Sequence, residues 1–153
     1  MTAKNLMTSD VKSCSPDTDL ASVAKIMWDR DCGSVPVVNE ERKVTGIITD
    51  RDICIAAATR STAPANIRVR DVMTGHVSTC SPDDDVRTVL NTMKKGRVRR
   101  LPVVDQQQRL VGIISTNDLV ARAECRTGAD VPGEEFLETL RTICKHSAAA
   151  VAV

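Results

Sequence analysis

Apolar and polar positions follow helical and strand periods in an order that occurs twice along the chain. Each copy starts with an extended segment that ends at a cysteine, Cys14 or Cys80, and continues with an amphipathic helix. Two short β-rich runs around a polar turn then predict a hairpin, and a second helix is predicted to start at Thr49 or Ser115. The helix faces are Leu20, Val23, Ala24, Met27 and Val86, Val89, Leu90, Met93; the strands are 35–38, 44–48, 101–104 and 110–114.

The two copies are an internal repeat. Met7-Thr8 recurs as Met73-Thr74, and at that offset of 66 residues 17 of 48 positions from residue 6 onward are identical, against roughly three expected by chance. We therefore predict a mixed α/β (α+β) fold of two βαββα repeats at 1–60 and 71–126. A linker at 61–70 joins them, and 127–153 form a loop, a C-terminal helix and a tail.

The sequence also predicts where the first helices begin and where a C-terminal helix lies. The Ser-Pro-Asp sequences at 15–17 and 81–83 predict helix starts, because Ser or Asp can cap and Pro fits the first turn. Residues 134–146 predict an amphipathic helix that covers either the chain's own core or a subunit interface. Its apolar side is predicted to be Phe136, Leu137, Leu140, Ile143 and Cys144, and the tail 148–153 to fray.

The amino-acid composition argues against several classes of function. One Trp, one Phe and no Tyr leave the core to aliphatic side chains and argue against single-stranded nucleic-acid recognition. The 21 basic and 20 acidic residues lack the cationic excess of a DNA-binding protein. Apolar runs are too short to span a membrane and the N-terminus lacks a secretory signal, so we expect a cytoplasmic protein.

Catalytic and metal-binding patterns are missing from the sequence. The two histidines, His76 and His146, stand alone, and nucleophile-elbow, zinc-protease and phosphate-loop motifs are absent. The six cysteines form no CxxC pair, which favours reduced, mostly buried thiols. Cys14 and Cys80 occupy equivalent positions and are expected to act as small buried apolar residues. We predict no enzyme activity, no catalytic residue and no metal site.

The sequences GIITDRD and GIISTND carry the clearest candidate chemistry. Thr49 and Asp52, like Ser115 and Asp118, lie three residues apart where a strand meets a helix. This spacing is typical of a capping box, in which hydroxyl and carboxylate bind amides of the first turn. It also suits a helix N-terminus that holds a phosphate while the carboxylate accepts from ribose hydroxyls. Both roles can coexist.

A basic run at 94–100, KKGRVRR, precedes the second hairpin. It is either a solvated helix end or part of an anion site. The first copy has DRDCGS at the same place, so the unit's fold does not require this charge. Together with Arg51, the run indicates an anionic ligand between the two copies.

These repeated motifs resemble a tandem pair of CBS domains, named for cystathionine β-synthase and also called a Bateman module. The resemblance covers about residues 1–125. It implies two βαββα units packed with pseudo-twofold symmetry, and two clefts that bind AMP, ADP, ATP, NAD or S-adenosylmethionine. It also implies that modules dimerise into a flat disk through the CBS helices.

The resemblance assigns binding roles by position. Thr49 and Ser115 would contact phosphate, and Asp52 and Asp118 the ribose. Arg99 and Arg100 would reach phosphates, and the apolar wall would be Val35-Pro36 and Leu101-Pro102. The backbone of Lys12, Ser13, Cys14, Ser78, Thr79 and Cys80 would meet adenine, with Ser34, Arg51 and Asn117 completing the sites.

The copies differ at these positions. Asp50-Arg51 corresponds to Thr116-Asn117, and Gly33-Ser34 to Arg99-Arg100, so the two sites are expected to differ in affinity or ligand. We expect a non-catalytic module that requires no cofactor, binds an adenosyl ligand as a regulator and signals to a downstream protein. The alternatives are a ligand-free dimerisation module, a thiol- or metal-responsive protein, and a nucleic-acid binder that uses residues 94–100.

Overall fold

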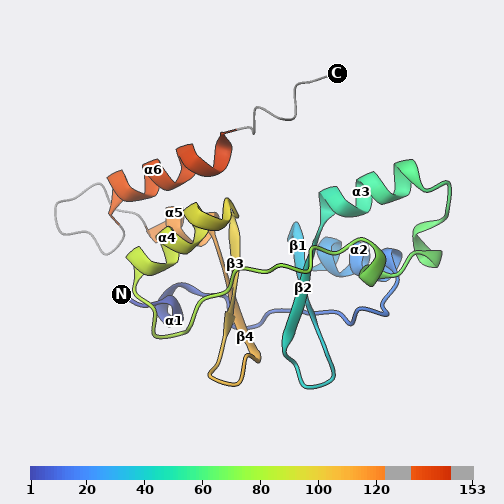
Figure 1. Cartoon of the computed structure of the whole chain (residues 1–153), viewed down its shortest axis with the longest axis horizontal. Helices are drawn as coiled ribbons and strands as arrows, with labels where there is room; N and C mark the ends of the chain where they lie inside the picture. Colours follow the sequence, from blue (N-terminus) through green and yellow to red (C-terminus); the bar gives the residue numbers. More distant parts are fainter. Residues whose placement is uncertain (123–131, 146–153) are drawn as a thin grey trace. The chain divides into compact units, whose positions relative to one another are not determined.

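The computed structural model describes residues 1–122 and 132–145, and its contacts divide the chain into two compact units. The repeat-1 unit comprises Ser9–Val77 and Val104–Val111, and the repeat-2 unit comprises Met1–Thr8, Ser78–Val103 and Gly112–Val153. Each sequence repeat supplies a two-stranded sheet and helices beside it, as Figure 1 shows. The predicted mixed α/β class is therefore confirmed.

The first helix of each repeat begins after an aspartate. Helix α2 spans Leu20–Asp29 and α4 spans Val86–Gly96. Asp19 accepts a hydrogen bond from the Ser22 amide at 2.9 Å, and Asp85 accepts from the Thr88 amide at 2.7 Å. The prediction that Ser-Pro-Asp caps these helices was wrong, because Ser15 accepts from the Asp17 amide and forms a turn ahead of the helix.

Both helices end in a left-handed residue that turns the chain toward the hairpin. Asp31 has φ 47° and Arg97 has φ 50°, and the following amides of Cys32 and Val98 donate back to Met27 and Met93 at 3.0 and 3.1 Å. This is the Schellman bond pattern, which usually uses glycine at the left-handed position. The chain then enters the next strand within a few residues.

The predicted hairpins are confirmed, and each strand is one residue longer than expected. Strand β1 (Ser34–Val38) pairs antiparallel with β2 (Val44–Thr49), with Ser34 opposite Thr49. Strands β3 (Arg100–Val104) and β4 (Leu110–Ser115) form the second sheet. The extended segments before the first helices add one bridge each, Cys14 to Val37 and Cys80 to Val103, both parallel.

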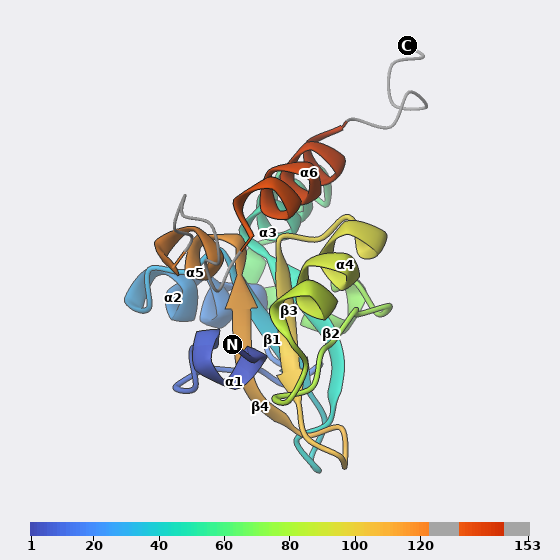
Figure 2. The ribbon, with the colours of Figure 1, turned by 90° about the vertical axis from the view of Figure 1, so that its left-hand side faces the viewer.

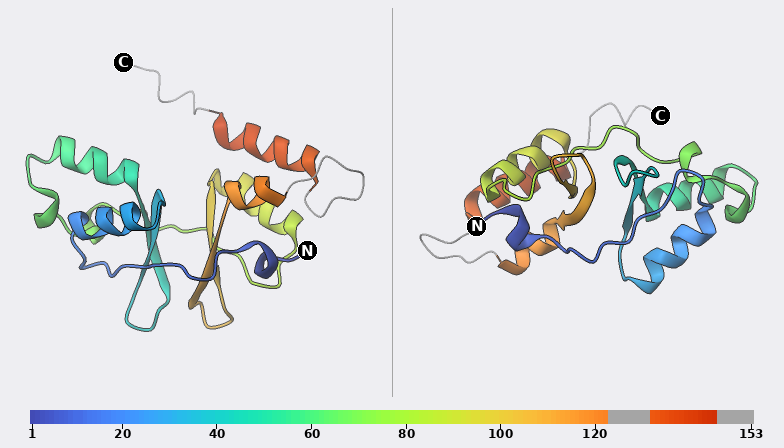
Figure 3. Two further views of the ribbon diagram at one scale, coloured as in Figure 1. Left: turned by 180° about the vertical axis from the view of Figure 1, so that it is seen from behind. Right: turned by 90° about the horizontal axis from the view of Figure 1, so that it is seen from below.

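The second helix of each repeat follows its hairpin directly. Helix α3 spans Asp50–Thr59, and α5 is described over Thr116–Arg122. In the repeat-1 unit α2 and α3 lie on the same side of the β1–β2 hairpin (Figure 3). The starts of these helices therefore lie at the ends of β2 and β4, where the candidate motifs were predicted.

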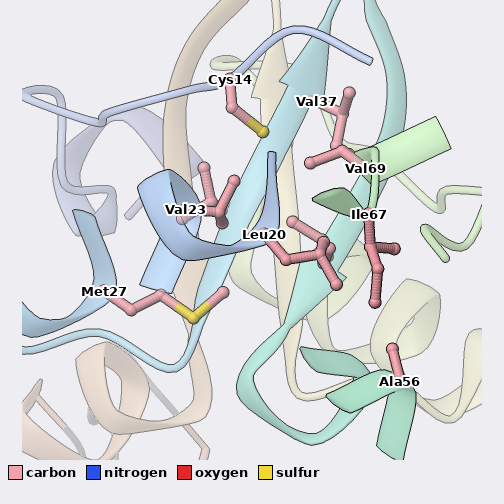
Figure 4. Close-up of a cluster of buried hydrophobic side chains, with 10 residues drawn as sticks. Cys14, Leu20, Val23, Met27, Val37, Ala56, Ile67 and Val69 are labelled. Atoms are coloured by element: carbon pink, nitrogen blue, oxygen red, sulfur yellow. The ribbon is translucent and has the colours of Figure 1, made fainter. Parts of the chain in front are cut away.

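The repeat-1 core is built from aliphatic side chains (Figure 4). Leu20 and Val23 from α2 are fully buried, and burying such a side chain stabilises the fold by about 1.5–3 kcal/mol. The segment expected as a linker contains two 3₁₀ turns, Pro64–Asn66 and Val69–Asp71, and it adds Ile67 and Val69 to this core. Its remaining members include Cys14, Met27, Val35, Val37, Ile48 and Ala56.

Each unit also takes a short segment from outside its own repeat. Thr8 pairs with Ile113 of β4, with the Thr8 amide donating to the Ile113 carbonyl at 2.9 Å. In the same way Thr74 pairs with Ile47 of β2, whose amide donates to Thr74 at 3.0 Å. Helix α1 (Ala3–Leu6) buries Ala3 and Leu6. Residues 1–8 thus complete the repeat-2 unit, and the segment that ends at Val77 completes the repeat-1 unit.

Helix α6 (Gly133–Cys144) packs on α4 in the repeat-2 unit (Figure 2). Of the two predicted roles for this helix, it covers the chain's own helix. It buries Phe136 and Thr139, whereas Leu137 and Cys144 are exposed, so their predicted place on the apolar side was wrong. The buried residues follow the helical spacing that starts at Phe136, which excludes position 137. The predicted tail, Cys125 and His146 lie outside the described residues.

Candidate functional site

The predicted capping boxes are present at both second helices. Thr49 Oγ1 accepts from the Asp52 amide at 3.2 Å, and Asp52 Oδ2 accepts from the Thr49 amide at 2.9 Å. Ser115 and Asp118 make the same bonds at 3.3 and 2.7 Å. The structural role predicted from the [ST]xxD spacing is confirmed in both repeats.

The hydroxyl and the carboxylate of each box are also bonded to each other. Thr49 Oγ1 donates to Asp52 Oδ2 at 2.7 Å, and Ser115 Oγ donates to Asp118 Oδ2 at 2.6 Å. A hydroxyl has one proton, so it must release this bond before it can donate to a phosphate. No described residue donates a hydrogen bond to the other carboxylate oxygen, Oδ1, which leaves it as an acceptor of the kind a ribose hydroxyl needs.

The loop before each hairpin lies against the start of the second helix. The Asp50 amide donates to the Gly33 carbonyl at 3.2 Å, and the Thr116 amide donates to the Arg99 carbonyl at 2.9 Å. Within the repeat-1 unit this contact brings buried Ser34 beside Thr49. In each repeat, therefore, backbone bonds hold together two of the predicted site segments.

The segment predicted to meet adenine lies along the hairpin in both repeats. The Cys14 amide donates to the Pro36 carbonyl at 3.1 Å, and the Cys80 amide donates to Pro102 at 3.1 Å. The residues predicted to form the apolar wall, Val35, Pro36, Leu101 and Pro102, are buried and are therefore part of each core. Ser13, Ser78 and Thr79 are half-buried, and Lys12 is exposed.

The charged members of the predicted sites lie closer to solvent. Arg51, Asn117 and Arg99 are exposed, and Arg100 is half-buried at the start of β3. Asp50 is exposed too, and its Oδ1 accepts from the Arg51 amide at 2.7 Å. The first turn of α3 therefore carries two carboxylates, Asp50 and Asp52, whereas the described first turn of α5 carries Asp118.

The thiols divide into two groups. Burial raises the pKa of Cys14 to about 11, and burial together with the charge of Asp84 raises the pKa of Cys80 to about 12. These two thiols are poor nucleophiles near neutral pH, in line with the predicted packing role. Cys32, Cys54 and Cys144 are exposed, so the prediction of mostly buried thiols was wrong for the described cysteines. Of the exposed thiols, Cys54 lies on α3, Cys144 lies on α6, and Cys32 follows the end of α2.

Two cavities open on the repeat-1 unit. A cavity of about 340 Å³ is lined by Ser13 and Cys14 of the predicted site, together with Thr18 and Ile26. A larger cavity of about 500 Å³ lies between α2 and α3, and its lining includes Met27, Trp28, Cys32, Asp50 and Cys54. This second cavity was not predicted from the sequence, although Asp50 and Cys54 have the spacing of one helix face.

No group of three or more His, Cys, Asp or Glu side chains in the described part of the chain is arranged to hold a metal ion. Among the described helices, none combines the length and apolarity that crossing a bilayer demands.

Fold and site together define a duplicated α/β module with a hydroxyl–carboxylate pair at the start of a helix in each copy. The family model of the CBS domain matches residues 3–58 and 69–124, and the chain belongs to the CBS domain family.

The chain spans only part of the length of the following two relatives. An uncharacterized protein of Methanopyrus kandleri is 34% identical over 72% of this chain and 57% of its own length. Inosine-5'-monophosphate dehydrogenase of Methanocaldococcus jannaschii is 34% identical over 78% of this chain. The chain spans only 23% of that enzyme.

Among solved structures, the CBS domain pair of protein MJ0100 matches with a TM-score of 0.72 and 28% identity. The match covers 79% of this chain and 94% of that one. That structure is a complex with 5'-methylthioadenosine and S-adenosyl-L-methionine. CBS domain pairs similar to this chain therefore include one that binds adenosyl ligands.

Proposed function

We propose that this chain is a non-catalytic sensor that binds adenosyl ligands and transmits their presence to a downstream protein. The observation that carries the proposal is the repeated box of Thr49 with Asp52 and Ser115 with Asp118 at helix starts. Helix amides and a hydroxyl suit a phosphate, and a carboxylate oxygen suits a ribose. The adenosyl complex of the similar MJ0100 domain pair supports the ligand class.

The two sites are proposed to prefer ligands of different charge. Asp50 adds a carboxylate next to Thr49, which disfavours a polyphosphate unless a cation accompanies it. In the second repeat the equivalent residue is Thr116, and Arg99 lies against the helix start. AMP, ADP, ATP or NAD therefore fits the site of Ser115 and Asp118 better. S-adenosylmethionine, which carries no phosphate, fits the site of Thr49 and Asp52.

Signalling requires that binding shifts an equilibrium between states that a partner distinguishes. We propose that this shift begins at the hydrogen bonds that the Thr49 and Ser115 hydroxyls donate to Asp52 and Asp118. A phosphate that accepts a hydrogen bond from the hydroxyl of Ser115 or Thr49 breaks the bond of that hydroxyl to Oδ2 of the neighbouring aspartate.

We expect a cytoplasmic homodimer, no nucleic-acid partner and no membrane partner, as the sequence predicts.

The test is a thermal-shift panel of AMP, ADP, ATP, NAD and S-adenosylmethionine on the wild type, Asp52→Asn and Asp118→Asn. A ligand at about 100 times its Kd should stabilise the wild type by about 2.7 kcal/mol. Each variant should lose the shift for the ligand of its own repeat. Asp19→Asn and Asp85→Asn are matched controls, because they change a helix-capping carboxylate outside the proposed sites. If no ligand in the panel raises the wild-type midpoint, the sensor proposal is wrong.

A further inference from the structure

Helix α6 lies on α4 through two ion pairs and an aromatic residue (Figure 2). Glu138 forms an ion pair with Lys94, and Glu135 forms one with Arg87 at 3.3 Å. Phe136 lies between these glutamates in the sequence and is 8% exposed. In the repeat-2 unit an acidic amphipathic helix thus meets a basic one.

The residues of α4 that α6 approaches lie on one face. Arg87, Leu90 and Lys94 follow the three- and four-residue spacing that brings side chains together along a helix. We call these three residues the α4 face. Its order of basic, apolar and basic residues is complementary to the glutamates and the phenylalanine of α6.

The fold of a repeat does not require this charge. At the offset of 66 residues, the equivalents of the α4 face in α2 are Ala21, Ala24 and Trp28. Trp28 is 86% exposed, so no described element covers it in the repeat-1 unit. Helix α4 therefore carries cations at two positions where its duplicate has none, and both cations pair with an acidic helix.

The contact of α6 is small and lies outside the repeat. The CBS domain match ends at residue 124, before α6 begins. Phe136 and Thr139 are the buried residues of α6, and the side chains of the ion pairs are 35% to 69% exposed. Ion pairs so open to water contribute little to stability. The contact therefore depends chiefly on one aromatic side chain, and another helix can compete for it.

We propose that the α4 face is the docking site for an acidic amphipathic helix of the downstream protein, and that α6 occupies this site as a built-in competitor. The partner helix carries an apolar anchor flanked by carboxylates, as α6 does. The proposal rests on the downstream partner of the proposed function. The partner's apparent affinity is reduced in proportion to the fraction of time that α6 leaves the face open.

The test uses the full chain and a fluorescent synthetic peptide of residues 132–145, whose binding is measured by anisotropy. Phe136→Asp places a carboxylate at the buried position and should release α6. The peptide should bind this variant at least about 10-fold more tightly than the wild type, the ratio expected if α6 occupies the face about 90% of the time. Leu137→Asp is the matched control, because Leu137 is 50% exposed on the same helix. It should bind the peptide like the wild type.

A charge exchange locates the bound peptide. In the Phe136→Asp chain, Lys94→Glu should weaken binding by about threefold or more, because it places a carboxylate opposite that of Glu138. A peptide that carries Glu138→Lys should restore the binding, since the pair then forms with its charges exchanged. Binding that does not respond to Lys94→Glu lies elsewhere on the chain and overturns the proposal.

Urea denaturation shows whether the released chain still unfolds cooperatively. If Phe136→Asp does not fold, the double variant Glu135→Lys with Glu138→Lys takes its place, because these side chains are 45% and 65% exposed. Failure of both variants to fold would show that α6 is an obligatory part of the repeat-2 unit, which overturns the proposal.

Three further results also overturn it. The wild type and the released variant can bind the peptide equally, the released variant can fail to bind it, or the released variant can form dimers that exclude it. The last result would show that the α4 face takes a second copy of the chain. The thermal shift with adenosyl ligands is a separate measurement, so ligand binding can be confirmed even if the docking proposal fails.

Discussion

Gly46 and Gly112 lie where each hairpin is approached by a segment from outside its own repeat. We call these segments, Met7-Thr8 beside β4 and Met73-Thr74 beside β2, the exchanged segments. A Cβ at Gly46 would lie 2.5 Å from Met73 Sδ and 3.1 Å from the Thr74 carbonyl oxygen. A Cβ at Gly112 would lie 2.5 Å from Met7 Sδ and 3.1 Å from the Thr8 carbonyl oxygen. The GII sequence is repeated because the incoming Met-Thr backbone approaches the strand so closely.

Gly46→Ala and Gly112→Ala are therefore expected to destabilise the fold, each by roughly 1–3 kcal/mol, the usual cost of overpacking. Methionine can move, but the carbonyl oxygen belongs to a paired backbone. Gly75→Ala is the control, since no heavy atom lies within 4 Å of its Cβ position. Urea denaturation of the three variants measures the effect. Equal midpoints for all three would show that the segments tolerate the added methyl group.

Several residues could be predicted from local spacing, and others could not. The boxes of Thr49 and Ser115 follow from a three-residue pattern, so the sequence predicted them. The caps at Asp19 and Asp85 were missed because nearby Ser and Asp residues compete for the same role. The exposed Trp28 was also missed, since whether a helix side is covered depends on elements that lie far away in the sequence.

At the scale of elements, the hydroxyl of each box stabilises the first turn of the second helix. Thr49→Ala and Ser115→Ala should each lower the unfolding free energy by about 1 kcal/mol without ligand, because an amide of the first turn loses its acceptor. Thr49→Ser and Ser115→Thr exchange the residues of the two repeats and should keep the stability of the wild type. Chemical denaturation checks this. An alanine variant as stable as the wild type would mean that the bonds of Asp52 or Asp118 suffice.

Acidic caps add a pH dependence to the first helices, and its sign follows from their hydrogen bonds. The Ser22 hydroxyl and amide lower the pKa of Asp19 below 3.8, and the Thr88 amide and hydroxyl lower that of Asp85. A lowered pKa stabilises the fold above the unfolded value, and this contribution is lost as pH falls through the folded pKa. The caps of α2 and α4 therefore keep their full contribution to the stability of the fold down to about pH 4.

At the scale of the whole molecule, the compact units do not follow the order of the repeats. Elements and hairpins could be predicted because both copies show the same periodicity. The exchange of segments could not, because Met7-Thr8 and Met73-Thr74 are identical and either fits β2 or β4. Which segment pairs with which strand depends on the path of the connecting chain, and hydrophobic periodicity does not predict that path.

A fragment of residues 1–60 is consequently expected to remain largely unfolded. It lacks Ile67 and Val69 of the core and the Thr74 pairing to Ile47, although it contains one full sequence repeat. A fragment of residues 9–77 holds these groups and should show more helix and a cooperative thermal transition. Circular dichroism of the two fragments decides the matter. A cooperative transition in 1–60 would show that the exchanged segment is dispensable.

The exchanged N-terminus also sets an order of assembly during synthesis. Residues 9–77 can begin to collapse as soon as Thr74 has left the ribosome, because all of the repeat-1 unit except Val104–Val111 has then been made. Thr8, by contrast, has no strand to join until Ile113 emerges, more than a hundred residues later. Contacts between positions so far apart in sequence form slowly, since a long loop must close first. Thr8 is thus translated early but pairs with its strand late.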